Sequence, residues 1–273
     1  GRMPLFDHIG ELRRRLIIIV VALLVAACIM YIITPGLIQF IIEPIRQYMP
    51  NDGQLNVLAP LDGFTIRFKV AMFASVIVTT PVWLWQLMGF FLPALKPNER
   101  KWVVPTFLIG VALFIVGNLF CYYIILDPAF QWMFSQTEEF ATVFADAAQF
   151  IDLILLFEIG FGIAFELPIV VFYLIVFNVV PYKKLRNSWR TVYIVLMVIC
   201  AMVTPDANPI TMILMFAAMV FLYEGSLLLA RVALGPKVKE QNEAYEKRKA
   251  EEQAEKEAYE AERAKRRAEK SKS

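Results

Sequence analysis

Histidine, cysteine and charged residues are all scarce in this chain of 273 residues. His8 is its single histidine, which excludes a multi-histidine metal site and a histidine-based catalytic triad within the chain. The cysteines Cys28, Cys121 and Cys200 all lie inside apolar runs, so a disulfide scaffold is excluded as well. Charged residues make up 19% and hydrophobic residues 59%, whereas an average soluble domain has about 25% and 45–50%. These proportions exclude an ordinary soluble globule and a disordered chain.

Long apolar runs take the place of the missing charge. A bilayer core about 30 Å thick needs roughly 20 apolar residues per helix. Four runs come close to that length or exceed it, at residues 16–33, 68–92, 103–126 and 153–177. Two further runs, 191–203 and 210–230, leave only about 20 Å of continuous apolar helix, because Pro205 closes the first and Glu224 interrupts the second. We therefore predict an all-α membrane protein of six transmembrane helices, the last two short, with either local bilayer thinning around them or partners that cover their ends.

The basic residues indicate how these six helices are oriented. With six spans, all but three of the 27 Lys and Arg residues fall on the side that holds both termini. The exceptions are Arg46, Arg67 and Lys69. The positive-inside rule therefore places both termini in the cytoplasm.

The segments outside the spans differ in character. The outer loops 34–67 and 127–152 contain apolar stretches, so we expect short interfacial helices that cap the bundle, with plain solvated loops as the alternative. Residues 237–273 are rich in Glu, Lys and Ala and have no seam of Leu, Ile or Val. We predict a transmembrane domain at 1–236 and a charged cytoplasmic tail at 237–273, solvated and either helical or disordered, for which a weak partner or lipid contact stays open.

Glu166 is a charged residue in the middle of an apolar run. A charge at that depth costs about 2.5–3.5 kcal/mol on insertion scales, so we expect its carboxyl group either to face water, a cavity or a partner, or to stay protonated. Pro168 removes a backbone donor close by, and an acid beside a broken hydrogen-bond ladder indicates a site. An interhelical hydrogen bond without further role is the alternative. We expect Glu158, eight residues earlier, to be half-solvated near the outer end, with its role open.

Two acids stand out among the basic residues of the cytoplasmic side, Glu11 and Glu99. Together they could form a carboxylate site for a cationic peptide, because carboxylates accept guanidinium groups in bidentate geometry and so distinguish Arg from Lys. Alternatively, Glu99 and Arg13 pair with each other or with their neighbours. Metalloprotease, hydrolase and P-loop signatures are missing from the sequence, so we expect no enzyme, no cofactor, no metal and no nucleic-acid partner.

Several motifs follow one another in a specific order between residues 4 and 232. They are Phe-Asp-His-Ile-Gly-Glu-Leu-Arg-Arg-Arg-Leu at 6–16, Glu-Pro at 43–44, Pro-Val-Trp-Leu-Trp-Gln at 81–86, Phe-Phe-Leu-Pro-Ala-Leu at 90–95 followed by Asn-Glu-Arg-Lys at 98–101, Phe-Glu-Leu-Pro at 165–168, and Thr-Pro-Asp at 204–206. In this order the sequence resembles the TatC family, the multispanning subunit of the twin-arginine protein translocase. Residues 206–211 depart from the ending that is common in that family.

The resemblance implies a receptor that binds the twin-arginine signal peptides of folded cargo at its cytoplasmic face. It implies TatA-type and, where present, TatB-type single-span partners, self-association in a larger complex, a bacterial-type plasma membrane, and export driven by the proton-motive force. By position, Glu11 and Glu99 would hold the arginine pair, with Arg13 and Phe90 supporting that surface. Glu166 would be the intramembrane acid, and the structural or partner-docking positions would be Pro44, Pro81, Thr204 and Thr211.

Two other functions remain as alternatives. A proton-coupled secondary transporter of small solutes would use Glu158 and Glu166 as a proton relay. That function leaves the acidic cytoplasmic site unused, and it predicts inverted repeats, which we do not find between 16–126 and 151–230. A passive scaffold for other membrane proteins would fit the short helices, but it gives no reason for Glu166.

Overall fold

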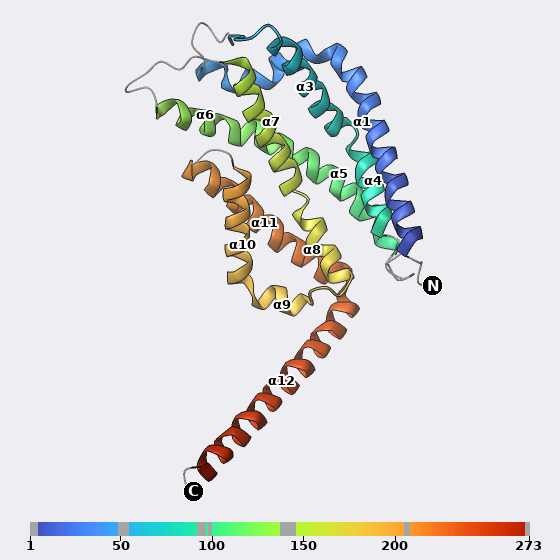
Figure 1. Ribbon diagram of the computed structural model, residues 1–273, viewed down its shortest axis with the longest axis vertical. Helices are drawn as coiled ribbons and strands as arrows, with labels where there is room; N and C mark the ends of the chain where they lie inside the picture. Colours follow the sequence, from blue (N-terminus) through green and yellow to red (C-terminus); the bar gives the residue numbers. More distant parts are fainter. Residues whose placement is uncertain are drawn as a thin grey trace.

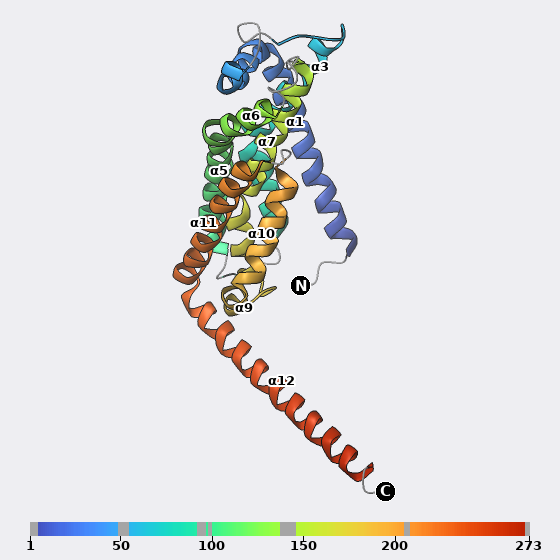
Figure 2. The same cartoon turned by 90° about the vertical axis from the view of Figure 1, so that its left-hand side faces the viewer.

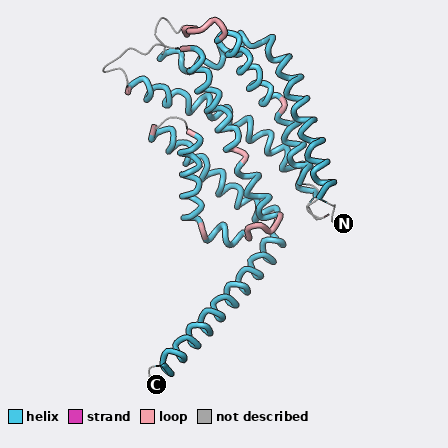
Figure 3. The backbone as a smooth tube through the Cα atoms, in the orientation of Figure 1, coloured by secondary structure: helices cyan, strands magenta, loops and turns pink. Residues whose placement is uncertain are grey.

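Helices form nearly all of the structure, which is a computed structural model (Figures 1 and 3). It describes residues 5–48, 55–91, 97, 100–136, 146–204 and 208–270. Long helices run side by side in a tilted bundle, and one helix leaves the bundle at the end near the N-terminus (Figures 1 and 2). Within the described ranges, the β pairing is a single isolated bridge between Asn56 and Asp146.

Helix α1, Leu5–Ile42, extends beyond the predicted span 16–33 in both directions. It passes through Pro35, whose missing N–H leaves the carbonyl of Tyr31 without its helical donor. The hydroxyl of Thr34 donates to that carbonyl at 2.8 Å, which helps the helix to continue. The loop after the first helix is therefore shorter than predicted, and it contains a 3-10 helix, η1, Glu43–Tyr48. Its location at a membrane interface stays a prediction.

The second apolar run forms two helices, α3, Asp62–Val78, and α4, Thr80–Phe91, which meet at a bend of 58°. The carbonyl of Val76, close to the bend, accepts the Thr80 hydroxyl and the Trp83 indole N–H, both at 3.1 Å. These two hydrogen bonds link the end of α3 to the first turn of α4 across the bend.

The third run forms η3, Arg100–Trp102, then α5, Val103–Phe120, then a π-helical turn, η4, Cys121–Ile125, and finally α6, Leu126–Ser135. The sequence predicts that the span ends near residue 126, but the helix continues as α6 into the outer cap. There Asp127 accepts hydrogen bonds from Gln47 at 2.6 Å and Tyr48 at 2.8 Å. These bonds tie η1 to α6 and close the outer end of the bundle.

The remaining runs form the other half of the bundle. Helix α7, Ala147–Ala164, is followed by α8, Leu167–Val176, with a break at Phe165 and Glu166. The short helix α9, Tyr182–Asn187, leads to α10, Trp189–Val203, and then to α11, Pro209–Ala233. Helix α12, Gly235–Lys270, continues beyond the bundle (Figure 2).

The lengths and the composition of the helices bear on the predicted number of membrane spans. Among the described residues, four helical stretches are long and apolar enough to cross a membrane, and the bent α3–α4 pair would make a fifth. Helix α10 has 15 residues, about 22 Å, and is short as predicted. Helix α11 has 25 residues, because it continues past Glu224, whose carboxylate is paired with Arg186 and Tyr193. The count of six spans stays a prediction.

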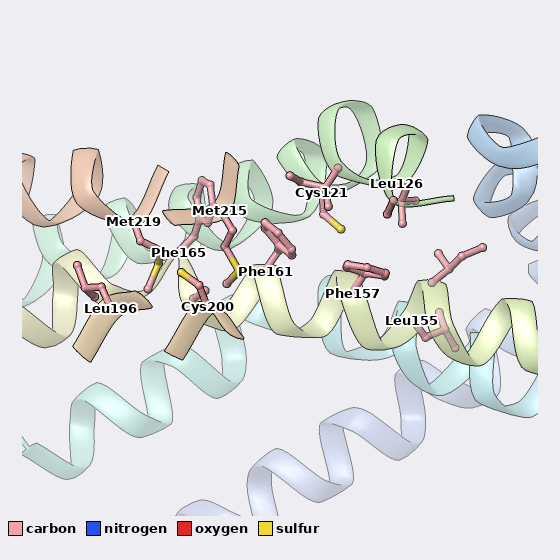
Figure 4. Close-up of a cluster of buried hydrophobic side chains, with 14 of the residues drawn as sticks. Cys121, Leu126, Leu155, Phe157, Phe161, Phe165, Leu196, Cys200, Met215 and Met219 are labelled. Carbon is pink, nitrogen blue, oxygen red and sulfur yellow. The ribbon is translucent and has the colours of Figure 1, made fainter. Parts of the chain in front are cut away.

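The core lies where α7 meets α5, η4, α10 and α11 (Figure 4). Phe157 and Phe161 of α7 are completely buried, as are Cys121 of η4, Cys200 of α10 and Met215 of α11. Large apolar side chains on the outside of the helices are exposed, as is typical of a bundle whose surroundings are lipid.

Candidate functional site

Glu11 lies on the first turns of α1, against the end of α4. Its carboxylate is partnered by Arg15, one turn further along the same helix. Arg15 donates to Glu11 Oε1 from Nη2 at 2.5 Å and from Nε at 3.1 Å. Both side chains are about one quarter exposed, so the pair lies at the rim of the bundle rather than in open solvent.

Arg15 also connects α1 to α4. Its Nη1 donates to the backbone carbonyl and to the side-chain oxygen of Gln86, both at 3.4 Å. The guanidinium lies against Gly89, where an added Cβ would come within 2.1 Å of Nη1. A glycine on α4 therefore gives Arg15 the space that it needs. Sequence reasoning did not single out Arg15, although its i,i+4 spacing from Glu11 was a signal for the ion pair.

The structure places the other residues of the predicted cytoplasmic site differently. Arg13 is exposed on α1, where it lines an outward-facing apolar groove with Leu12 and Leu16. Phe90 is half-buried near the end of α4. Glu99 lies outside the described residues. Glu11 and the end of α4 are therefore brought together, whereas the pairing of Glu11 with Glu99 stays a prediction.

Glu166 lies at the break between α7 and α8, in the interior of the bundle. Both of its carboxylate oxygens are buried and have no hydrogen-bond partner among the described residues. Gly110 of α5 lies beside it, because an added Cβ there would lie 3.3 Å from Oε2 of Glu166 and 3.6 Å from a methyl group of Leu84. The site therefore offers two unsatisfied acceptors between α4, α5 and α7, which is costly unless a donor is supplied from outside the chain.

Glu158 is buried, with 5% of its surface exposed, so the expectation that it is half-solvated is wrong. The π-helical turn η4 brings the thiol of Cys121 to its carboxylate, while its Oε1 lacks a partner in the described structure. Asn118 of α5 is buried as well, and its side-chain oxygen also lacks a hydrogen-bond partner in the described structure. The interface between α5 and α7 thus contains a second set of buried polar groups. Their burial could not be predicted from the sequence, because it depends on the neighbouring helix.

The remaining predicted residues lie at helix ends and at the bend. Pro44 is half-buried in η1, and Pro81 is exposed in the first turn of α4. Thr204 is buried and its hydroxyl donates to the Cys200 carbonyl at 2.8 Å. Thr211 is completely buried and donates to the Asn208 carbonyl at 3.0 Å.

Comparison with known proteins identifies the family of this chain. The family model described as "Sec-independent protein translocase protein (TatC)" matches residues 7–217, which include Glu11, the α4 bend and Glu166. The chain belongs to the TatC family. Proteins named TatC from Frankia casuarinae and Deinococcus radiodurans are 33% and 32% identical to it, each over 84% of this chain. The chain spans 65% of the first protein and 86% of the second.

A solved structure agrees with the family assignment. The crystal structure titled "Twin Arginine Translocase Receptor- TatC in DDM" matches with a TM-score of 0.70 and 32% sequence identity. The match covers 82% of this chain and 99% of the crystallised one. The all-α membrane fold predicted from the sequence is confirmed. TatC relatives are named as translocase proteins, which indicates a role in transport rather than catalysis. Helix α12 lies beyond the residues that match the TatC family model.

Proposed function

We propose that this chain is the receptor subunit of a twin-arginine translocase and that it binds twin-arginine signal peptides at its cytoplasmic face. The observation that carries the proposal is the Glu11 carboxylate, held against α4 by a guanidinium that hydrogen-bonds one of its oxygens. A carboxylate already arranged for one guanidinium is suited to receive another. Glu99, in the loop that follows α4 in the sequence, would be the second acceptor.

The orientation of the chain is part of this proposal. The N-terminal end of α1, helix α9 and the beginning of α12 all lie toward one end of the bundle (Figure 1). Arg13, Lys183, Lys184 and Lys237 belong to these segments. The positive-inside rule makes this end cytoplasmic, in a bacterial-type plasma membrane. Residues 1–236 would be the membrane domain, and 237–273 would follow it on the cytoplasmic side.

Glu166 gives a reason for partner proteins. Two buried acceptors without donors would be satisfied by a polar side chain of a single-span helix that enters from the membrane. TatA-type and TatB-type proteins are the partners implied, in a larger complex that contains several copies of the chain. Export would draw its energy from the proton-motive force, since the sequence contains no nucleotide-binding motif. Pro44 and Pro81 would shape the cap and the bend, and Thr204 and Thr211 the helix ends.

The experiment that tests the proposal is a binding titration with the full chain in nanodiscs. The ligand is a labelled twin-arginine signal peptide, and the comparison peptide has both arginines replaced by lysine. We expect the arginine peptide to bind at least about tenfold more tightly, because only guanidinium binds carboxylates in bidentate geometry. Glu11→Gln should abolish most of this preference.

A matched control separates the site from a general loss of negative charge. Glu43 is an exposed acid of η1 that pairs with Arg46 at 3.1 Å, and Glu43→Gln should leave the preference unchanged. Equal binding of both peptides to the unaltered chain contradicts the proposal. The secondary transporter keeps one supporting observation, the buried acids Glu158 and Glu166, and solute flux under a proton gradient would favour it.

A further inference from the structure

Helix α12 begins as part of the membrane bundle rather than as a separate tail. Val238 is buried, and the ammonium group of Lys237 donates to the Val176 carbonyl at the C-terminal end of α8. The side-chain amide of Gln241 donates to the Ile175 carbonyl at 2.8 Å and also to the side chain of Asn178. The carbonyls at the end of a helix lack helical donors. The first turns of α12 therefore cap α8 and hold it in place.

Contact with α12 extends one turn further. Lys183 of α9 forms an ion pair with Glu246, which lies five residues beyond Gln241. The backbone N–H of Tyr182, at the start of α9, also donates to the Gln241 side chain at 3.4 Å. The direction in which α12 leaves the bundle is thus set by contacts with both α8 and α9.

This arrangement encloses a cleft with a volume of about 1480 Å³. Its lining residues come from three parts of the chain that are far apart in the sequence: Pro97, Lys101 and Trp102, then residues between 178 and 184, and residues between 233 and 252. Five of the lining residues are basic, Lys101, Lys184, Lys237, Arg248 and Lys249. Two are acidic, Glu240 and Glu252, so the cleft has an excess of positive charge.

The residues of α12 that line the cleft share one face of the helix. Lys237, Gln241, Tyr245, Arg248 and Glu252 recur at intervals of three or four residues, as expected for one helical face. Other basic residues of α12, including Lys239, Lys247 and Lys256, are exposed and do not line the cleft. The helix therefore offers two groups of cations that differ in position but not in charge.

The cleft lies at the level where lipid headgroups would be. Its walls are the entrance of α5, the end of α8 and the end of α11, which are all ends of apolar helices. Trp102, with the ammonium group of Lys101 5.7 Å from its ring centre, is the kind of residue that marks a membrane interface. Val179, Ala233 and Leu234 add an apolar side to the same cleft.

From the charge, the location and the apolar side together, we infer that this cleft binds the phosphate headgroup of an anionic phospholipid. Basic pockets between membrane helices on the cytoplasmic side suit such headgroups. Lys184, Arg248 and Lys249 would meet the phosphate, and the acyl chains would lie along the apolar side toward the bilayer. The bound lipid would contact η3, α9 and α12, three segments that do not follow one another in the sequence.

The test uses native mass spectrometry of the full chain in detergent, with phosphatidylglycerol or phosphatidylcholine of identical acyl chains added in steps. We expect a clear preference for phosphatidylglycerol. The triple variant K184Q/R248Q/K249Q should bind it about tenfold more weakly, because each cation near a membrane surface contributes measurably to anionic lipid binding. The control K239Q/K247Q/K256Q removes the same number of positive charges, all of them from α12, and should bind within about twofold of the unaltered chain.

Several outcomes would overturn the inference. Equal phosphatidylglycerol binding by the two triple variants would show that the cleft is not the site. Displacement of the lipid by glycerol phosphate at equal concentration would show a site for soluble phosphate instead. Preferential retention of an acidic peptide would indicate a protein partner. Signal-peptide binding by the site variant is measured in parallel, so failure here is distinguishable from failure of the receptor function, which depends on Glu11.

Discussion

The guanidinium of Arg15 reaches Glu11 on its own helix and Gln86 on α4 at the same time. The ion pair is therefore not a simple i,i+4 contact on a helix surface, which would contribute only about 0.3–0.5 kcal/mol. It sets the position of the Glu11 carboxylate relative to α4. A signal peptide that brings its own arginines would compete with Arg15 for that carboxylate.

The first prediction concerns the space that Gly89 leaves for Arg15. In Gly89→Ala the new Cβ would collide with Nη1, so Arg15 must move away from Gln86. We expect signal-peptide affinity to fall several-fold with little change in thermal stability, because the displaced atoms are the end of a flexible side chain. In an Arg15→Ala background the same substitution should have no effect, since nothing remains to be displaced. Additive effects of the two substitutions on affinity would contradict this coupling.

The second prediction concerns the acceptors at Glu166. Glu166→Gln keeps a hydrogen-bonding side chain of the same shape, whereas Glu166→Leu removes it. We expect Gln to support partner recruitment and export close to the unaltered level, and Leu to lower both at least about tenfold. Co-purification of the single-span partner and export of a folded reporter measure the two effects. Equal export by the Leu variant would mean that the acid has no role beyond packing.

The third prediction tests the close approach of α5 and α7. An added Cβ at Gly117 would lie 2.9 Å from the Phe161 backbone carbonyl and from the Phe165 side chain, so the helices must separate. We expect Gly117→Ala to destabilise the bundle by about 1–3 kcal/mol. Gly225 of α11 has no atom within 4 Å of an added Cβ, and Gly225→Ala should raise stability by up to about 1 kcal/mol. Thermal unfolding in detergent compares the two, and a loss of equal size in both variants would contradict the packing argument.

The fourth prediction concerns the pH dependence of α12 docking. The hydrogen bond and charge of Lys183 lower the pKa of Glu246 below its ordinary value of 4.5. A lowered pKa in the docked state means that the ion pair contributes fully above the ordinary pKa and is lost as the pH falls through the lowered one. We expect the distance between spin labels on α9 and α12 to increase only in that acidic range.

Two variants serve as the comparison for this pH effect. In Glu246→Gln the acidic transition of the label distance should disappear, because the group that titrates is gone. Glu251 is an exposed acid of the same helix, five residues beyond Glu246, and Glu251→Gln should keep the transition. A transition of equal size in Glu246→Gln would assign it to another group.

Much of the fold could be predicted from the sequence, because lipid imposes simple conditions on a chain. Apolar runs about 20 residues long must be helical, and basic residues must gather on one side. Glu166 could be identified for the same reason, since a carboxylate inside an apolar run needs an explanation wherever its helix lies. The motifs at 6–16 and 165–168 resemble TatC by sequence alone, and the family assignment is confirmed.

Helix ends were predicted less well. The first helix continues through Pro35 because the Thr34 hydroxyl replaces the missing donor, a compensation that a proline-based rule does not anticipate. The span after Val103 continues into α6 because a π-helical turn, rather than a loop, absorbs the change of direction. Both are local events, but they depend on hydrogen bonds that a hydropathy pattern does not contain.

Only the tertiary structure decided which residues of different helices are in contact. Sequence by itself determined the helical class, the apolar spans, the distribution of charge and the acid at Glu166. The burial of Glu158 against Cys121, the reach of Arg15 to Gln86 and the docking of Gln241 on α8 required the relative rotation and height of packed helices. Helical periodicity defines the faces of one helix but not the face that its neighbour presents, so such contacts follow from packing alone.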